Sequence, residues 1–197
     1  MKISDHIKYS LDACDARDLD KAMLFACLAV DGTAKKTYPE INRVGERYKR
    51  FIDDNIDIVE LMFGGINLSE TIFPIKGNRE KHGLKFAEVI YEKYRCSLAH
   101  GDELPEGYGI NMRIAEGQAS FSIDIHNHTM TMPESAIYAL GIICVLAPKN
   151  SNERIGNNGY HYRDTINTFP VDRWWGKADC ARQVMDFASL ARVKLVF

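Results

Sequence analysis

The feature that most constrains this fold is the spacing of its apolar residues, which repeats at steps of three and four through most of the first 100 residues. Such spacing gives a helix one apolar stripe, which has to be buried against other helices. Four helices are predicted in this way: Ile3 to Cys14, Arg17 to Lys36, Ile41 to Phe63 and Leu84 to Gly101. The pattern therefore predicts a mainly α fold built as a helical bundle.

The sequence changes character after the fourth predicted helix. Ile110 to Ala115 and Ala119 to His126 alternate apolar and polar residues around Glu116-Gly117, which is typical of a β-hairpin. Thr129 to Met132 extends this small sheet. Pro133 is expected to open a buried helix that ends at Leu146.

The chain is expected to form one domain. It has 197 residues, of which 46% are hydrophobic, and this is enough for one sizeable core. No repeat or low-complexity linker divides it. We expect a helical core at about 1–101 and 133–147, a β-hairpin at about 109–132, and a C-terminal extension at 148–197 that ends in a helix from about Lys177 to Arg192.

Composition indicates a cytoplasmic protein with no membrane partner. The first 20 residues carry charges throughout, which argues against a signal peptide. The longest apolar run, Ala136 to Ala147, is too short to span a bilayer. The five cysteines lie far apart without a CxxC pair, so we expect reduced thiols and neither a disulfide framework nor a zinc site.

The end of the fourth predicted helix carries the residues best suited to chemistry, in the stretch Tyr94-Arg95-Cys96-Ser97-Leu98-Ala99-His100-Gly101. Arginine offers a permanently charged fork that fits phosphate oxygens, and histidine moves protons near neutral pH. In an ideal helix Arg95 and His100 differ by about 140° around the axis and ~7.5 Å along it. A joint site therefore needs fraying of the helix after Leu98 or a second copy of the motif.

This stretch resembles the Arg-x4-6-His motif of HEPN domains, which are helical bundles that include many metal-independent ribonucleases acting as dimers. The resemblance implies that Arg95 and His100 are catalytic, that both subunits contribute, and that RNA cleavage leaves a 2′,3′-cyclic phosphate. No metal or other cofactor is implied. Cys96 and Ser97 would line the site, and Cys96 departs from the family pattern, in which a polar residue follows the arginine.

Besides a pure dimerisation scaffold, two other interpretations of the motif remain open. The first is a non-catalytic module of the same fold that binds RNA, a nucleotide or a protein, such as an accessory in defence or in a toxin–antitoxin pair with a protein inhibitor or antitoxin. The second is a purely structural pair. In that case His100 contacts the last carbonyls of its helix, and Arg95 pairs with Glu88, Glu92 or another acid.

The remaining charged and histidine residues give weaker signals. The formal net charge of −2 does not indicate nucleic-acid binding, although the segment from Lys35 to Arg50 sums to +4. A second Arg-x6-His pair, Arg154 and His161, lies in a polar, glycine-rich loop and is interpreted as a chance match. His126 and His128 have a spacing that suits a metal, but without an evident third ligand we expect solvent-facing hairpin residues.

Overall fold

The computed structural model describes residues 1–64, 66–76, 82–111, 122–124, 127–156, 159–163 and 168–184. Within these residues the fold is mainly helical with small sheets, as predicted. The helices are α1 (Ile3–Asp15), α2 (Leu19–Thr37), α3 (Val44–Asp53), α4 (Ile56–Met62), α5 (Phe86–Val89), the π-helix η2 (Ile90–Arg95), α6 (Cys96–Ala99), α7 (Ser135–Leu146), the 3-10 helix η3 (Pro148–Asn150), α8 (Val171–Trp174) and α9 (Ala178–Val184). The strands are β1 (Phe73–Lys76), β2 (His82–Leu84), β3 (Tyr108–Asn111), β4 (Ser122–Asp124), β5 (Thr129–Pro133), β6 (His161–Arg163) and β7 (Thr168–Pro170).

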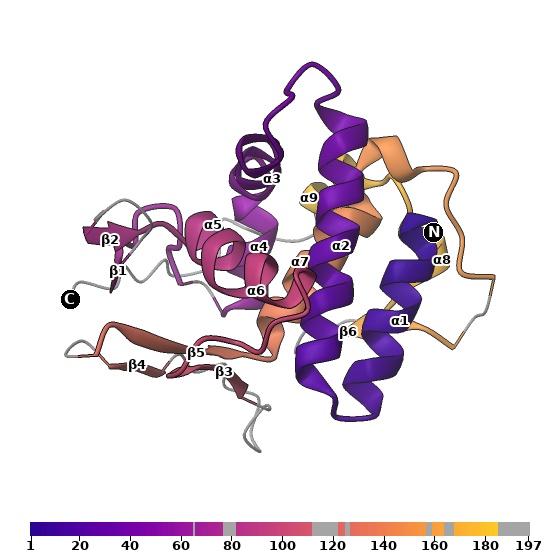
Figure 1. Cartoon of the computed structure of the whole chain (residues 1–197). Helices are drawn as coiled ribbons and strands as arrows, with labels where there is room; N and C mark the ends of the chain where they lie inside the picture. Colours follow the sequence, from indigo (N-terminus) through magenta and orange to yellow (C-terminus); the bar gives the residue numbers. More distant parts are fainter. Residues whose placement is uncertain are drawn as a thin grey trace.

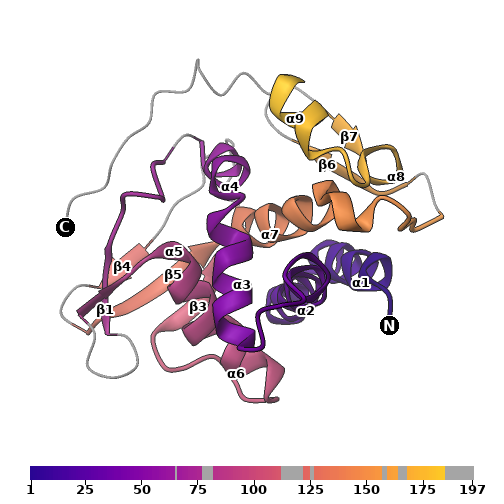
Figure 2. The same cartoon turned by 90° about the horizontal axis from the view of Figure 1, so that it is seen from above.

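Helix α2 lies at the centre of the bundle and packs against α1, α3 and α7 (Figures 1 and 2). Its buried face is rich in small residues, and Ala22, Ala26 and Ala29 are completely buried. Small side chains let neighbouring helices approach closely on several sides of one helix. Helix α7 is apolar almost all round and almost entirely buried, as expected for a helix that lies inside a bundle.

The helix predicted from Ile41 to Phe63 is wrong in one respect, because the structure divides it into α3 and α4. Asn55 breaks it: its side-chain amide donates to the Phe51 carbonyl at 2.8 Å, and its φ is −122°. Asparagine competes in this way with the helical backbone. The break places Asp57 in the first turn of α4, where a carboxylate is favoured by the helix dipole.

The predicted β-hairpin is also corrected. Strands β3 and β4 do not pair with each other, since β5 lies between them, parallel to β3 and antiparallel to β4. The physical reason is burial, because Met130 and Met132 of β5 face the core at 1% and 0% exposure and so favour the central position. The residues between β3 and β4 lie outside the described part of the chain.

Two smaller predictions differ in detail. Pro133 ends β5, opposite Asn111, and α7 begins two residues later at Ser135. The C-terminal helix begins at Ala178, one residue from the predicted start, and the described residues end at Val184. Two further two-stranded sheets join β1 to β2 and β6 to β7. Among the described residues, no helix has both the length and the apolar character needed to cross a membrane.

Candidate functional site

The motif lies on a helix that changes form along its length, from α5 through the π-helix η2 to α6. The wide π turn is visible in the backbone, where the Cys96 N–H donates to the Tyr91 carbonyl five residues earlier. The first turn is capped by Glu88, whose carboxylate accepts the Lys85 N–H at 3.0 Å. Single π turns inside helices occur frequently at functional sites. Arg95 is the last residue of this turn.

Tyr94 connects the helix that carries the motif to the three-stranded sheet of β3, β5 and β4. The side chain is completely buried, and its hydroxyl reaches the carbonyls of Gly109 and Met130 at 3.1 and 3.0 Å. Burial raises the pKa of Tyr94 well above its usual value, so the hydroxyl remains a hydrogen-bond donor. The residue that follows, Arg95, therefore starts from a rigid position.

Arg95 is held by Asp31 of α2. Its Nε and Nη2 donate to Asp31 Oδ2 at 2.8 and 2.6 Å, and the two side chains are 17% and 16% exposed. Burial by itself would lower the pKa of Arg95, but the hydrogen bonds and charge of Asp31 raise it overall. Nη1 has no hydrogen-bond partner among the described residues, and the buried Oδ1 of Asp31 likewise has none. Arg95 is thus fixed in orientation and keeps one donor group for a ligand.

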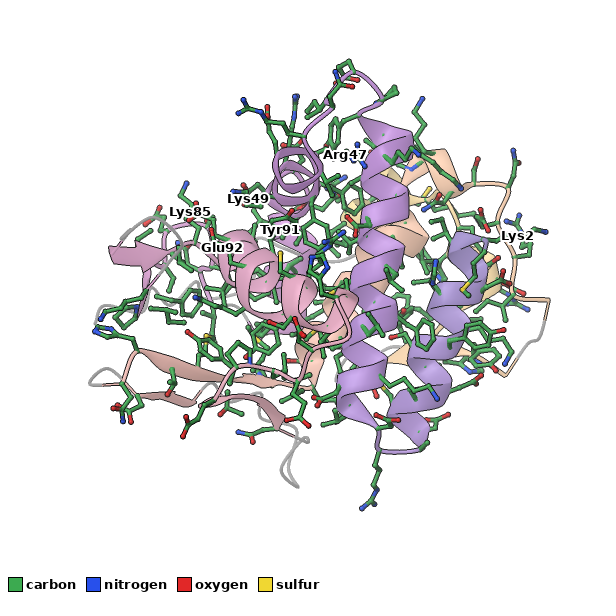
Figure 3. The ribbon with its side chains drawn as sticks, viewed as in Figure 1. Lys2, Arg47, Lys49, Lys85, Tyr91 and Glu92 are labelled. Carbon is green, nitrogen blue, oxygen red and sulfur yellow. The ribbon has the colours of Figure 1, made fainter. Side chains whose placement is uncertain are left out.

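The Tyr91 ring lies close to two cations, of which Lys49 is labelled beside it in Figure 3. The guanidinium carbon of Arg95 lies 5.6 Å from the centre of the Tyr91 ring, and Nζ of Lys49, from α3, lies 6.0 Å from it. The ring packs against buried Tyr48, with 5.3 Å between ring centroids. Helix α3 approaches this closely because it carries Gly45, where a Cβ would lie 2.8 Å from the Tyr91 ring.

His100 lies at the exposed end of α6. Its backbone is still helical, with φ −89° and ψ −1°, and its N–H donates to the Cys96 and Ser97 carbonyls. The helix therefore does not fray after Leu98. Within the described residues the imidazole makes no hydrogen bond, so the contact with the last carbonyls that a structural pair would need is not observed.

Gly101 ends the helix, as predicted. Its φ is +80°, and the Asp102 N–H returns to the Ser97 carbonyl at 3.1 Å, which is a Schellman motif. The adjoining Gly101 N–H donates to the Leu98 carbonyl at 3.2 Å. His100 therefore sits on a well-defined helix end.

The other two predicted site residues contribute differently. Ser97 Oγ donates to the Lys93 carbonyl at 3.2 Å, so its proton is committed to its own helix. Cys96 is half-buried beside Tyr91, whose pKa is raised by burial first and then by the neighbouring Cys96 and Asp31. Arg95 and Cys96 thus lie beside Tyr91, whereas the Ser97 hydroxyl is hydrogen-bonded to the backbone of its own helix.

The site also includes three residues that were not predicted from the sequence, Asp31, Tyr91 and Lys49. The pairing of Arg95 with an acid was one of the open alternatives, but the partner is Asp31 rather than Glu88 or Glu92. One signal pointed to Asp31: it follows completely buried Cys27 by one helical turn, which puts a carboxylate beside an apolar stripe.

The second Arg–His pair shows no comparable organisation. Arg154 Nη1 donates to the carbonyls of Ser151 and Glu153, and His161 Nδ1 lies 2.9 Å from the Gly159 carbonyl. No described contact joins Arg154 to His161, in agreement with a chance match.

The pair of hairpin histidines is only half described. His128 Nδ1 lies 2.9 Å from the Pro74 carbonyl, so this ring joins the turn before β5 to β1. His126 lies outside the described residues. In the part of the chain that the structure describes, no three potential metal ligands come together.

Comparison with known proteins places the chain in a family. The family model Rv1289 matches residues 2–197. The proteins printed as "Uncharacterized protein Rv1289" of Mycobacterium tuberculosis and "Uncharacterized protein Mb1320" of Mycobacterium bovis are each 30% identical over 202 residues, covering 100% of this chain and 94% of their own length. No solved structure matches the chain. The chain therefore belongs to the Rv1289 family.

Proposed function

We propose that this protein is a metal-independent endoribonuclease whose site is formed by two copies of the chain. One observation carries the proposal: Arg95 is oriented by Asp31 and Tyr91, with Nη1 unpaired, on a helix that presents exposed His100 at its end. A fixed cation and an available imidazole are the two groups that acid–base cleavage of a phosphodiester needs. The resemblance to HEPN domains supports the same function.

The proposed chemistry uses the 2′-hydroxyl of RNA. His100 removes the 2′ proton, the 2′ oxygen attacks phosphorus, and the bond from phosphorus to the 5′ oxygen breaks. The partner subunit's His100 donates a proton to the leaving 5′ oxygen. The products are a 2′,3′-cyclic phosphate and a 5′-hydroxyl, and Arg95 Nη1 stabilises the charge that develops on the phosphoryl oxygens.

The helical geometry supports a site that is shared by two copies. Because the backbone stays helical through His100, Arg95 and His100 of one chain remain about 140° apart around the axis. A phosphate that contacts Arg95 of one chain would therefore obtain at least one of its two histidines from a second helix end. A two-fold dimer, the commonest oligomer, would bring equivalent helix ends together.

The residues around Arg95 suit a single-stranded polyanion. Lys49, Tyr91 and Arg95 form a series of cation, aromatic ring and cation across α3 and η2. Grooves that bind single-stranded nucleic acids combine these two types of side chain, because cations track the phosphates and rings stack on bases.

The test is cleavage of end-labelled single-stranded RNA in EDTA. His100→Gln is the most direct variant, because His100 is exposed and unbonded, and we expect a loss of about 100-fold or more. Arg95→Lys keeps the charge but loses the fork, and we expect a loss of at least about tenfold. Arg154→Lys and His161→Gln are the matched controls and should retain full activity. Full activity of His100→Gln, or equal cleavage of RNA with a 2′-deoxy scissile nucleotide, would refute the proposal.

Mixing the wild-type protein with an inactive variant tests whether two chains share the site. If each site needs both copies of His100, a ninefold excess of the His100→Gln protein should reduce the activity per wild-type chain to about one tenth by forming mixed dimers. A site contained in one chain predicts no change. Light scattering on the same samples reports whether dimers are present.

The second candidate is a non-catalytic module that binds RNA, a nucleotide or a protein partner. It is favoured by the neutralisation of part of the Arg95 charge by Asp31 and by Cys96 in the position that follows. RNA that binds without being cut, with affinity reduced in Lys49→Ala and Tyr91→Ala and falling steeply with salt, would support this candidate over the nuclease.

A further inference from the structure

Helix α2 carries apolar side chains on a side that faces away from the core. Residues 22–30 form an uninterrupted apolar run, so apolar side chains point to every side of the helix. Leu24, Phe25 and Leu28 are only half-buried, and they are not among the side chains that pack against the core of the described residues. A solvent-facing helix stripe normally carries polar residues, so these three side chains indicate a surface that is covered by a partner.

This apolar stripe lies between α1 and the helix that carries Arg95. On one side the Phe25 ring packs against Tyr9 of α1, with 5.2 Å between ring centroids, and Tyr9 is 42% exposed. On the other side Asp31 of α2 is paired with Arg95 at 2.6 Å. Leu28 is three residues from both Phe25 and Asp31, so it lies in the middle of the stripe. The α2 face is the name used below for Tyr9, Leu24, Phe25 and Leu28.

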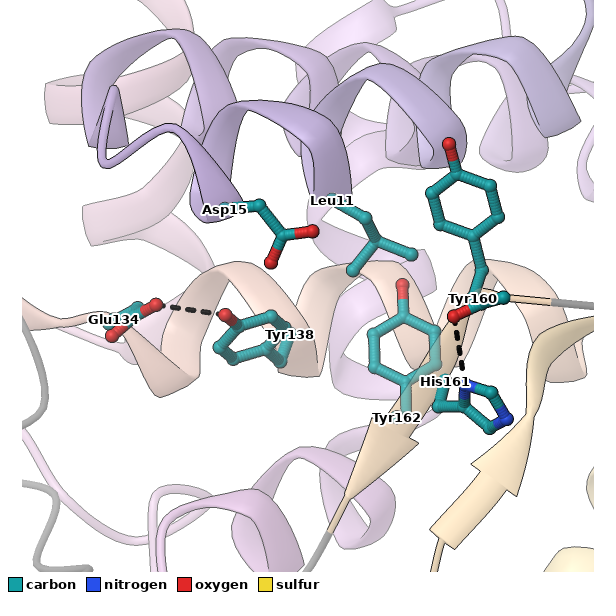
Figure 4. A pocket seen from close by; sticks show the side chains of 8 residues that line it. Leu11, Asp15, Glu134, Tyr138, Tyr160, His161 and Tyr162 are labelled. Atoms are coloured by element: carbon teal, nitrogen blue, oxygen red, sulfur yellow. Dashed lines mark hydrogen bonds between the residues drawn. The ribbon is translucent and has the colours of Figure 1, made fainter.

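The opposite flank of α1 is occupied by its own chain. The Tyr160 hydroxyl donates to Asp12 of α1 at 2.6 Å. Leu11 lines a pocket of about 330 Å³ that is bounded by α1, α7 and β6 (Figure 4). Helix α7 packs against both α1 and α2, behind them in the view of Figure 1. Within the described residues, the open apolar surface of this helix pair is therefore the α2 face.

The two ends of α2 differ in charge. Acids outnumber the single lysine at its start, whereas its last turn carries two lysines: Asp18, Asp20 and Lys21 at the start, and Lys35 and Lys36 at the end. Burial first, and then nearby acids that include Asp18, raise the pKa of Asp20. Glu153 engages Lys36, and exposed Lys35 forms no ion pair with the described residues. The α2 face is thus bounded by a negative end and a positive end.

We propose that the α2 face is the surface through which two copies of this chain meet, with their α2 helices antiparallel. Antiparallel pairing places the acidic start of each helix near the lysines at the end of its partner, whereas parallel pairing would bring like charges together. A two-fold axis that passes beside Leu28, perpendicular to the helices, generates this arrangement and buries the same apolar patch on both copies. The partner of the α2 face is therefore the α2 face of a second copy.

This inference rests on the proposed function for the choice of a second copy, and it states where the two copies meet. Asp31, which holds Arg95, is about 4.5 Å from Leu28 along the helix. A two-fold axis at Leu28 therefore leaves the two pairs of Asp31 and Arg95 on the same side of the paired helices, about 9 Å apart along them. Both helices that carry the motif would then border one surface of the dimer.

Sedimentation velocity of the full-length protein without RNA tests the surface. We expect the wild type to have the mass of two chains at micromolar concentration. Leu28→Arg should weaken the dimer at least about 100-fold, because a change beside a two-fold axis brings two like charges together. Leu28 does not pack against the core, so this variant should fold, which circular dichroism checks. Ile72→Arg is the matched control, since it alters a 49% exposed apolar residue outside α1 and α2, and it should leave the dimer intact.

Cysteine crosslinking tests the antiparallel orientation. The background protein is Cys96→Ser with Cys180→Ser, which removes the two cysteines that are not buried. In this background a short bis-maleimide should join two copies of Leu28→Cys. Lys21→Cys and Lys35→Cys should each fail to crosslink alone, because equal positions lie about 21 Å apart along an antiparallel pair, but a mixture of the two should crosslink.

The outcomes separate this inference from the proposed ribonuclease. A wild-type protein that is monomeric up to about 100 µM overturns both the surface and the shared site. A dimer that survives Leu28→Arg, or that crosslinks through Lys21→Cys alone, overturns the antiparallel α2 face and leaves the shared site standing. A monomeric Leu28→Arg protein that cuts RNA at the wild-type rate supports the surface and overturns the shared site.

Discussion

At the residue scale, the ion pair of Arg95 and Asp31 both orients the candidate site and contributes to the fold. Both side chains are less than one fifth exposed, so each charge depends on the other for its solvation. Removing one partner leaves an uncompensated charge in a partly buried position. The loss of activity in an Arg95 variant is therefore ambiguous unless folding is measured as well.

We predict strong coupling between these two residues. Arg95→Met should lower the free energy of unfolding by about 3 kcal/mol, whereas Arg95→Met combined with Asp31→Leu should cost clearly less than the sum of the two single changes. Urea denaturation of the four proteins measures this double-mutant cycle.

The pair of Arg182 and Asp57 provides the control for this cycle. It has a similar N–O distance of 2.7 Å, but its side chains are 33% and 32% exposed. The same cycle there should give a coupling energy of about 1 kcal/mol or less. Equal coupling energies in the two pairs would contradict the argument from burial.

At the scale of elements, local pattern predicted the long helices well. The predicted helix from Ile3 ends one residue from the observed end of α1, and α2 differs by one or two residues at its ends. These helices follow from apolar periodicity, and Gly101 follows from the preference of a left-handed position for glycine. The break at Asn55 and the π turn at 90–95 were not predicted, because each is a local departure from a period that otherwise continues.

Contacts between segments far apart in the sequence could not be predicted from local patterns. The central position of β5 depends on its burial against helices, and the hairpin signal near Glu116 reports only local alternation. The candidate site also depends on a contact between residues that are far apart in the sequence. Arg95 and His100 were identified from their chemistry, but Asp31 lies 64 residues before Arg95 and no spacing rule connects the two.

The close packing of α3 against η2 at Gly45 gives a testable prediction. Gly45→Ala should push the Tyr91 ring away from its place near Lys49 and Arg95, because the new Cβ would lie 2.8 Å from the ring. A better helix propensity offsets part of the overpacking, so stability should change by less than about 2 kcal/mol. RNA affinity, measured by fluorescence anisotropy, should fall several-fold.

Val44→Ala is the control for this change, because it alters an exposed residue on the same turn of α3. It should leave RNA affinity at the wild-type value. If Gly45→Ala binds RNA as well as the wild type does, the Tyr91 ring is not part of an RNA-binding surface.

At the scale of the whole molecule, the segment after α7 ties the bundle together through polar contacts. Asn150 is completely buried, and its amide donates to Thr33 Oγ1 and to the Cys144 carbonyl, both at 2.9 Å. Glu153 accepts the N–H and hydroxyl of Ser4 at 3.1 and 2.8 Å and pairs with Lys36 at 2.8 Å. One short segment thus holds the start of α1 to the end of α2.

This arrangement predicts a stability difference that depends on pH. Burial alone would raise the pKa of Glu153, but the hydrogen bonds from Lys36 and Ser4 lower it overall, below the ordinary value of 4.5. A lowered pKa contributes stability above pH 4.5, and this contribution is lost as the pH falls through the pKa of the folded state. Glu153→Gln should therefore cost about 1–2 kcal/mol at pH 7, and the difference from the wild type should shrink progressively below pH 4.5.

Chemical denaturation between pH 3 and pH 8 measures this dependence. Glu106→Gln, at an exposed position without a described side-chain contact, should match the wild type throughout. A penalty for Glu153→Gln that persists unchanged at pH 3 would show that the shape of the side chain, rather than its charge, holds α1 to α2. A penalty that disappears on acidification would assign the link to the charged carboxylate, because protonated glutamate and glutamine then present neutral groups of nearly the same size.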